Sequence, residues 1–178
     1  MAPTDFPLLD EPLAIALVDT EGVHRGRAFD LLADDGRLVS WLDRQRVRIG
    51  ADAGPSPEDA VLALRAALRR VFTAVTADMA PPGDDVRAIN DALESGGGFD
   101  ALDWSTTRGP TAVRRGDTVL GRLAESAVRV LAHADPGPLR RCGNPRCVLF
   151  FAAANPRRRY CSPACSLRLR VARHAARH

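Results

Sequence analysis

The sequence predicts a mainly α-helical protein with small β-hairpins, divided into a helical N-terminal domain and a small cysteine-rich C-terminal module. Three observations lead to this prediction. Apolar residues recur at helical spacing over much of residues 1–138, clusters of Pro and Gly separate these stretches, and all four cysteines lie in residues 139–178. The turn-forming sequence Asp135 to Pro138 marks the boundary between the two parts.

The first expected elements are short. The run from Leu13 to Thr20 (LAIALVDT) is almost entirely apolar, and so short a run does not separate a helix from a buried strand. Between Phe29 and Arg44, leucine and valine recur at helical intervals with Trp41 beside them, which predicts a second helix.

The clearest helix is expected over residues 57–77. Ser56 is a candidate cap, Pro57 suits the first helical position, and Asp59 lies near the positive end of the helix dipole. Its apolar residues recur three and four positions apart: Val61, Leu64, Leu68, Val71, Phe72 and Val75. This spacing is typical of a structural helix packed on a core.

Three further elements complete the N-terminal part. A shorter helix is expected over residues 85–94, between a Pro-Pro-Gly break and a glycine-rich stretch. Residues 101–107, with Trp104, and 111–115 favour β structure on either side of a Gly-Pro turn, which predicts a hairpin. Helical spacing returns over residues 118–133.

Charge separates the two parts sharply. Residues 1–138 hold 15 Arg and 22 Asp plus Glu, a net charge of −7, whereas residues 139–178 hold 10 Arg and no acid, a net charge of +10. Clustered positive charge of this kind indicates an anionic partner. Lysine is absent, which we interpret as the mark of a GC-rich genome. Without a long apolar run or a basic leader, we expect a cytoplasmic protein and no membrane partner.

The cysteines are spaced C-x4-C-x13-C-x3-C and comprise Cys142, Cys147, Cys161 and Cys165. In a cytosolic protein thiols stay reduced, so metal binding is favoured over disulfides. Two close pairs of thiolates suit the tetrahedral coordination of Zn²⁺, and a closed site of four cysteines makes the ion structural rather than catalytic. The alternatives are an iron–sulfur cluster, a thiol-based sensor, a redox pair, and four unrelated buried thiols.

The residues around the cysteines predict how the module folds. Turn formers lie within the first pair, Val148 to Phe151 favours a strand, and Arg157 to Tyr160 is expected to return as its partner. Ser162 and Pro163 suit a helix start, which places Cys165 in the first turn. This order of knuckle, hairpin, knuckle and helix predicts a treble-clef-like zinc finger with one structural zinc.

These residues resemble a known family. The C-terminal module resembles the bacterial CGNR-type zinc fingers, on the match of the residues Cys142, Cys147, Phe150, Arg157 to Tyr160, Cys161, Cys165 and Arg168. The N-terminal part resembles the ABATE domain, because LAIALVDT occupies the position of the family's L-A-L-D-hydrophobic-V-N-T stretch. The resemblance implies a transcription regulator associated with stress responses. Asp19 replaces the family's Asn, and Cys165-Ser166-Leu167-Arg168 keeps only the Cys and Arg of the tetrapeptide that names the family.

Arginines of the module form the candidate nucleic-acid surface: Arg157, Arg158, Arg159, Arg168, Arg170, Arg173 and Arg177. A final helix is expected to turn Leu167 and Val171 toward the zinc hairpin and its arginines outward. Guanidinium groups can bind phosphates or guanine edges. Few aromatic residues are available for stacking on single strands, so duplex DNA is the favoured partner. One small module makes few contacts, so specificity favours a homodimer.

The leading hypothesis is therefore a zinc-dependent DNA-binding transcription regulator whose N-terminal domain senses a stress state or an unidentified small-molecule effector. A second is a protein-interaction module whose basic tail binds an acidic partner. A third is a small-molecule-binding protein or enzyme with a pocket around Asp19, Thr20 and Trp41. Catalysis is not expected, because the four histidines are scattered and none stands at a catalytic spacing from an acid.

Overall fold

The computed structural model describes residues 6, 10–24, 27–50, 52–105, 107, 109–133 and 136–175. Its helices are α1 (Leu13–Val18), α2 (Arg37–Ile49), α3 (Glu58–Val75), α4 (Gly83–Gly96), α5 (Val119–Val128), which continues as a π-helical turn (Arg129–His133), and α6 (Pro163–Ala175). Its strands form three antiparallel hairpins: β1 (Glu21–His24) with β2 (Arg27–Asp30), β3 (Phe99–Ser105) with β4 (Gly109–Arg115), and β5 (Leu139–Arg141) with β6 (Phe150–Ala152). The predicted fold class, mainly helical with small hairpins, is confirmed.

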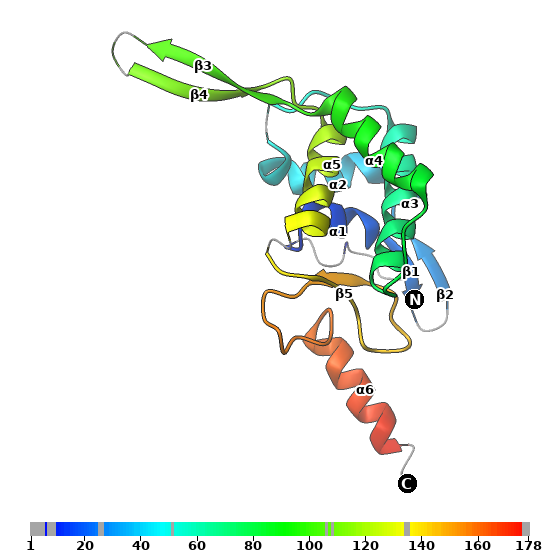
Figure 1. Ribbon diagram of the computed structural model, residues 1–178. Coiled ribbons are helices and arrows are strands. Elements are labelled where there is room, and N and C mark those ends of the chain that lie inside the picture. The colour runs from blue at the N-terminus through cyan, green and yellow to red at the C-terminus, as the bar shows by residue number, and fades with distance from the viewer. Residues whose placement is uncertain are drawn as a thin grey trace.

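The elements are arranged along one long direction (Figure 1). Helices α1 to α5 form the central body, from which the β3–β4 hairpin extends at one end. The cysteine-rich module lies at the opposite end of the body, and α6 projects beyond it to the C-terminus. No helix in the described ranges is both long enough and apolar enough to span a membrane.

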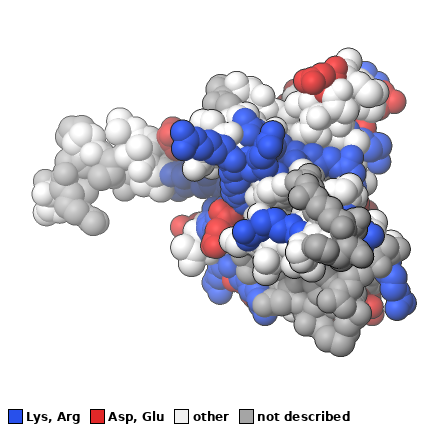
Figure 2. All heavy atoms as spheres, turned by 90° about the horizontal axis from the view of Figure 1, so that it is seen from below, with Lys and Arg blue, Asp and Glu red and all other residues white. Residues whose placement is uncertain are grey.

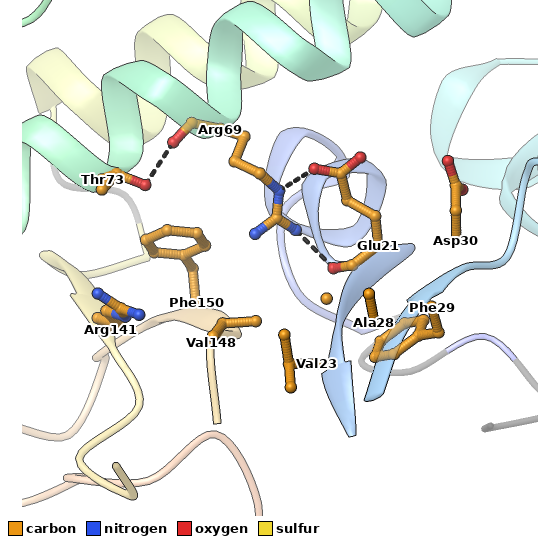
Figure 3. Close-up of a pocket in the computed structure, with 11 residues that line it drawn as sticks. Glu21, Val23, Ala28, Phe29, Asp30, Arg69, Thr73, Arg141, Val148 and Phe150 are labelled. Carbon is orange, nitrogen blue, oxygen red and sulfur yellow. Dashed lines mark hydrogen bonds and ion pairs between the residues drawn. The ribbon is translucent and has the colours of Figure 1, made fainter. Parts of the chain in front are cut away.

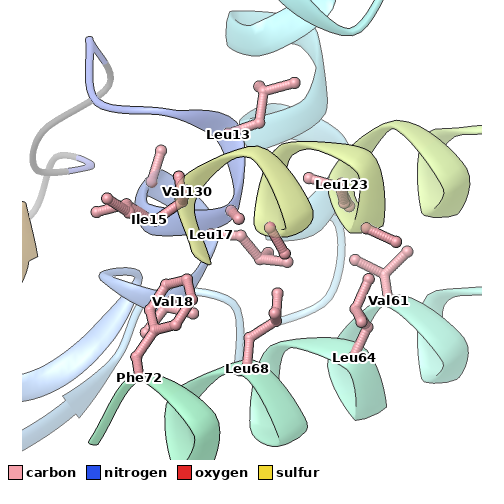
Figure 4. Packing of buried hydrophobic residues seen from close by; sticks show 14 of the residues in the cluster. Leu13, Ile15, Leu17, Val18, Val61, Leu64, Leu68, Phe72, Leu123 and Val130 are labelled. Atoms are coloured by element: carbon pink, nitrogen blue, oxygen red, sulfur yellow. The ribbon is translucent and has the colours of Figure 1, made fainter. Parts of the chain in front are cut away.

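Helix α1 forms the centre of the core. All six of its residues are buried, and it contacts α2, α3, α5 and strand β6. Figure 4 shows side chains from α3, such as Leu68 and Phe72, and from α5, such as Leu123, meeting Leu17 and Val18 of α1. Because this segment is surrounded on every side, its apolar run carries no helical periodicity, which is why the sequence alone does not separate helix from strand.

Two predictions about the N-terminal part were wrong. The helix expected from Phe29 begins only at Arg37, since Arg27–Asp30 pairs with β1 and Gly36 lies in the left-handed region (φ 74°) just before α2. Leu31 and Leu32 are buried as expected, but from a turn. Ser56 does not cap α3; its Oγ accepts a hydrogen bond from the backbone N–H of Leu120 in α5 (3.0 Å).

Helices α4 and α5 cross at two glycines. A Cβ atom added to Gly121 would overlap the backbone carbonyl of Gly96, so this position holds no side chain while the backbones keep this separation. Thr118 links the two helices at this crossing. Its Oγ1 donates a hydrogen bond to the Gly96 carbonyl (3.2 Å) and accepts one from Gly121 N (3.1 Å). The glycine at the C-terminal end of α4 thus allows close packing of the two helices.

Gly121→Ala is therefore expected to destabilise the fold by about 1–3 kcal/mol or more, because the obstructing atoms are backbone. The matched control is Gly83→Ala at the start of α4, where the nearest atom to an added Cβ is the end of the flexible Arg87 side chain. Urea unfolding of both variants measures the difference. Equal stability of the two variants would contradict the packing constraint at the crossing.

Candidate metal centre and basic surface

The four cysteines form one buried cluster. The Sγ atoms of Cys142, Cys147, Cys161 and Cys165 all lie within 4.8 Å of one another, and each residue is at most 8% exposed. The Sγ separations are 3.8 Å for Cys147–Cys161 and 3.5 Å for Cys161–Cys165. A tetrahedral site with Zn–S bonds of about 2.3 Å places neighbouring sulfurs about 3.8 Å apart. The cluster therefore fits one structural Zn²⁺.

The strand pairing differs from the one expected. Strand β6 pairs with β5, with Arg141 opposite Phe150, so the first cysteine pair lies in the loop of this hairpin. Residues 157–160 form no strand, although Gly143 N donates to the Arg159 carbonyl (2.9 Å). The predicted hairpin was wrong because Leu139–Arg141, preceding the first cysteine, takes the edge of β6 assigned to the return strand. The predicted helix start is confirmed, since α6 begins at Pro163 and holds Cys165 in its first turn.

Polar groups of the module hold the sulfurs in place. Cys142 Sγ accepts a hydrogen bond from Cys161 N (3.5 Å), and Cys165 Sγ accepts one from Arg168 Nη2 (3.0 Å). The side-chain amide of buried Asn144 donates to the Cys165 carbonyl (3.1 Å), which ties the first turn of α6 to the opposite knuckle. Donors of this kind stabilise thiolate charge and orient metal ligands.

The sulfurs are also electrostatically coupled. Hydrogen bonds from Cys147 and Cys161 lower the pKa of Cys142, whereas the hydrogen bond to Cys142 raises the pKa of Cys147. The pKa of Cys161 is raised by its hydrogen bonds to Cys142 and Cys147 and by burial. The raised pKa values favour the protonated thiols of Cys147 and Cys161, and a bound divalent cation supplies the positive charge that allows several thiolates to lie this close.

The module is built into the core of the N-terminal part. Phe150 is 1% exposed and packs edge-on against Phe72 of α3, with ring centroids 5.6 Å apart. Two carboxylates cover the outer edge of β6. Asp19 accepts from Phe150 N (3.0 and 3.2 Å), and Glu11 accepts from Ala152 N (2.8 Å). An otherwise unpaired strand edge is thereby satisfied by side chains that flank α1.

Comparison with known proteins supports this picture. The model of the ABATE family, described as "Putative stress-induced transcription regulator", matches residues 11–134. The chain belongs to the ABATE family. The model of the CGNR zinc finger matches residues 139–178, so the module is hereafter called the CGNR finger. No curated protein matched the chain.

The candidate nucleic-acid residues fall into two groups. Arg157, Arg159 and Arg170 are exposed. Arg158 instead lies within the CGNR finger, where it pairs with Glu11 (2.7 Å), donates to the Cys161 carbonyl (2.7 Å) and stacks on Phe151 (4.5 Å). Arg168 is exposed but donates to Cys165 Sγ. The side chain of Arg173 and the whole of Arg177 lie outside the described residues.

Sequence reasoning missed two exposed arginines of the CGNR finger, Arg141 and Arg146. Residues 139–178 contain no acid, and this feature of the sequence makes every arginine of the segment a candidate for the surface, including these two. Seen from the end that carries α6, arginines gather in a central band, with acidic groups mostly at its margins (Figure 2). The surface that Arg141, Arg146, Arg157, Arg159, Arg168 and Arg170 form is hereafter called the basic surface.

The three tentative ligand-binding residues have other partners. Asp19 binds the backbone of β6. Thr20 donates to the Leu17 carbonyl (2.6 Å) and accepts from Arg65 Nη1 (3.0 Å). Trp41 is fully buried in the core, and its Nε1 has no hydrogen-bond partner among the described residues. All three are inaccessible to a ligand in this conformation, and a cavity elsewhere is lined by different residues.

Burial also sets the ionisation of Asp19. Desolvation raises its pKa well above the ordinary value, while the hydrogen bond from Phe150 and the charge of Arg69 offset this only in part. The folded state therefore binds a proton that the unfolded state releases, over the range between the ordinary and the raised pKa. Across that range the contribution of Asp19 to stability falls as pH rises.

Asp19→Asn is expected to remove the loss of folding stability that ionisation of Asp19 causes as pH rises. The amide stays neutral, and its oxygen still accepts a hydrogen bond from Phe150 N. At pH 8 the variant should be more stable than the unchanged protein by about 1 kcal/mol or more, and the difference should vanish below about pH 4. Asp19→Ala should instead lose about 1–3 kcal/mol, because Phe150 N is left unpaired. Urea unfolding against pH measures both. Equal losses in the two variants at pH 8 would refute the interpretation.

Proposed function

We propose that the protein is a transcription regulator that binds duplex DNA through the basic surface of its zinc-stabilised CGNR finger. The main support for this proposal is a set of exposed arginines in a segment that contains no acidic residue. Arg141, Arg146, Arg157, Arg159 and Arg170 make no ion pair with any residue of the described ranges. Guanidinium groups without partners attract phosphates, and binding relieves their mutual repulsion.

The shape of the CGNR finger favours a duplex over a single strand. Phe150 and Phe151 are at most 1% exposed and Tyr160 packs on the cysteine cluster, so these rings are not free to stack on bases. Helix α6 instead projects from the finger, held at its first turn by Cys165 (Figure 1). A helix of 13 residues is about 20 Å long, which suits insertion into a major groove.

The exposure of α6 corrects one expectation. Leu167 and Val171 are 54% and 61% exposed, so they do not pack on the zinc hairpin. In this proposal α6 enters the groove as a helix exposed on most sides, and its apolar groups are free to contact thymine methyl groups. The regulator acts as a homodimer here, because one module of this size supplies few contacts.

DNA binding is tested with the double variant Arg157→Ala/Arg159→Ala on zinc-loaded protein. Log affinity falls with log salt concentration, and each phosphate contact contributes about 0.9 to the steepness of this slope. We therefore expect the slope of the double variant to be shallower by about 2. The matched control is Arg27→Ala/Arg46→Ala, which removes two exposed arginines of the N-terminal part. Fluorescence anisotropy with labelled duplex measures both.

The control should keep the slope of the unchanged protein. Salt-insensitive binding, or the same slope in both double variants, would contradict DNA binding through the basic surface. Capture of acidic proteins without any binding to a random duplex pool would favour the protein-interaction module instead.

A further inference from the structure

A cavity of about 520 Å³ lies at the seam between the two parts of the chain. Its walls come from α3, from the β1–β2 hairpin and from the CGNR finger (Figure 3). The volume is within the range of small-molecule sites, about 300–1,000 Å³. This space, hereafter the seam cavity, is separate from both the cysteine cluster and the residues Asp19, Thr20 and Trp41.

The two parts meet closely beside the seam cavity. A Cβ atom on Gly22 of β1 would lie 3.2 Å from Cγ2 of Val148 in the CGNR finger and 3.0 Å from the Phe29 ring. Val148 and Phe150 of the finger share the lining with Val23 and Phe29 of the hairpin. A ligand with an apolar body would therefore contact both parts at once, and its burial would hold them together.

Two acids, Glu21 and Asp30, and two arginines, Arg69 and Arg141, line the seam cavity, and Arg65 behind the lining adds a third positive charge. Glu21 is paired with Arg69, and Asp30 with Arg65 (2.6 Å), so both carboxylates are already neutralised. Arg141, at the end of β5, lines the cavity and has no ion pair among the described residues.

The Arg69 guanidinium also has a hydrogen-bond donor that is not used by the described residues. Its Nη2 donates to the carbonyls of Val18 and Glu21 (2.5 Å each), but its Nη1 makes no hydrogen bond to a described residue. Figure 3 shows the Arg69 guanidinium between Glu21 and Phe150, with Arg141 beyond Phe150 on the finger side. Donors from α3 and from β5 thus border one space.

We propose that the seam cavity binds a small organic anion, in which a carboxylate is joined to an apolar or aromatic body. Arg141 and Nη1 of Arg69 hold the carboxylate, and Val23, Phe29, Val148 and Phe150 surround the body. The binding itself stands on the cavity alone, whereas the role of this anion as the effector of the regulator rests on the proposed function.

The position of Arg141 couples this site to the basic surface. A carboxylate bound to Arg141 neutralises one of the arginines offered to phosphate and joins the CGNR finger to the β1–β2 hairpin. The anion and DNA therefore compete for Arg141, and we expect the anion to weaken binding to a duplex. By reciprocity, duplex DNA weakens binding of the anion by the same factor.

Binding is tested by NMR titration of the full-length, zinc-loaded chain with four probes. Benzoate carries both features of the proposed ligand, benzyl alcohol keeps the ring without the charge, benzylamine reverses the charge, and acetate keeps the charge without the ring. We expect benzoate to bind at least about tenfold more tightly than the other three, with shifts centred on Val23, Phe29 and Val148.

Two pairs of variants control the titration. Arg141→Ala should weaken benzoate binding about tenfold, whereas Arg146→Ala, an exposed arginine outside the seam cavity, should leave it unchanged. Ala28→Trp places a ring in the cavity from β2 and should abolish binding, whereas Ala112→Trp, at an exposed position of β4, should not. No binding of benzoate, equal binding of benzyl alcohol, or equal losses in Arg141→Ala and Arg146→Ala would overturn the proposal.

A separate arm measures duplex DNA binding with and without benzoate. If benzoate binds at the seam cavity but the chain binds no duplex, the proposed function fails while the site stands. If duplex binds and benzoate does not, the site fails while the proposed function stands. If both bind without affecting each other, the coupling through Arg141 is refuted.

Discussion

The coordination of one zinc ion by four sulfurs is the constraint on which the C-terminal part of the molecule depends. The described part of this segment, residues 139–175, forms two short strands and one helix and buries too little apolar surface to fold alone. The ion joins Cys142 and Cys147, in the loop of the β5–β6 hairpin, to Cys161 and to Cys165 in the first turn of α6. It thereby sets where the helix leaves the finger and where its arginines lie.

The CGNR finger is not a separate appendage, because its strand β6 belongs both to the β5–β6 hairpin and to the core of the N-terminal part. On one edge β6 pairs with β5 and carries the loop with the first two ligands. On the other edge its N–H groups bind Asp19 and Glu11, and Phe150 fills the core beside Phe72. Strand β6 therefore joins the core around α1 to the finger, and its Phe150 also lines the seam cavity.

Local signals in the sequence predicted much of this structure. The spacing of the cysteines predicted the cluster, the residues after Pro57 predicted α3, and Ser162-Pro163 predicted the start of α6. What the sequence did not predict depends on contacts between distant residues. The pairing of β5 with β6 brings Leu139 opposite Ala152, and Asp19 lies 131 positions from Phe150. Asp19 was placed in a candidate ligand pocket with Thr20 and Trp41, and its actual partner, the backbone N–H of Phe150, is visible only in three dimensions.

The roles of individual arginines were equally hidden from the sequence. Arg157, Arg158 and Arg159 are chemically identical neighbours, yet only Arg158 turns inward to Glu11 and Phe151. A charge run predicts that a surface is basic without predicting which members form it. Arg141 illustrates the converse, since its place beside the seam cavity follows from the register of the β5–β6 hairpin.

The most direct test of the central claim is the metal content of the purified full-length chain, measured together with its amide NMR spectrum. We expect one zinc per chain. We also expect Cys147→Ser to release the ion and collapse the resonances of residues 139–175 while those of α3 and α5 remain dispersed. Purified protein without zinc, or an equally ordered C-terminal segment in the serine variant, would contradict zinc as the organising element.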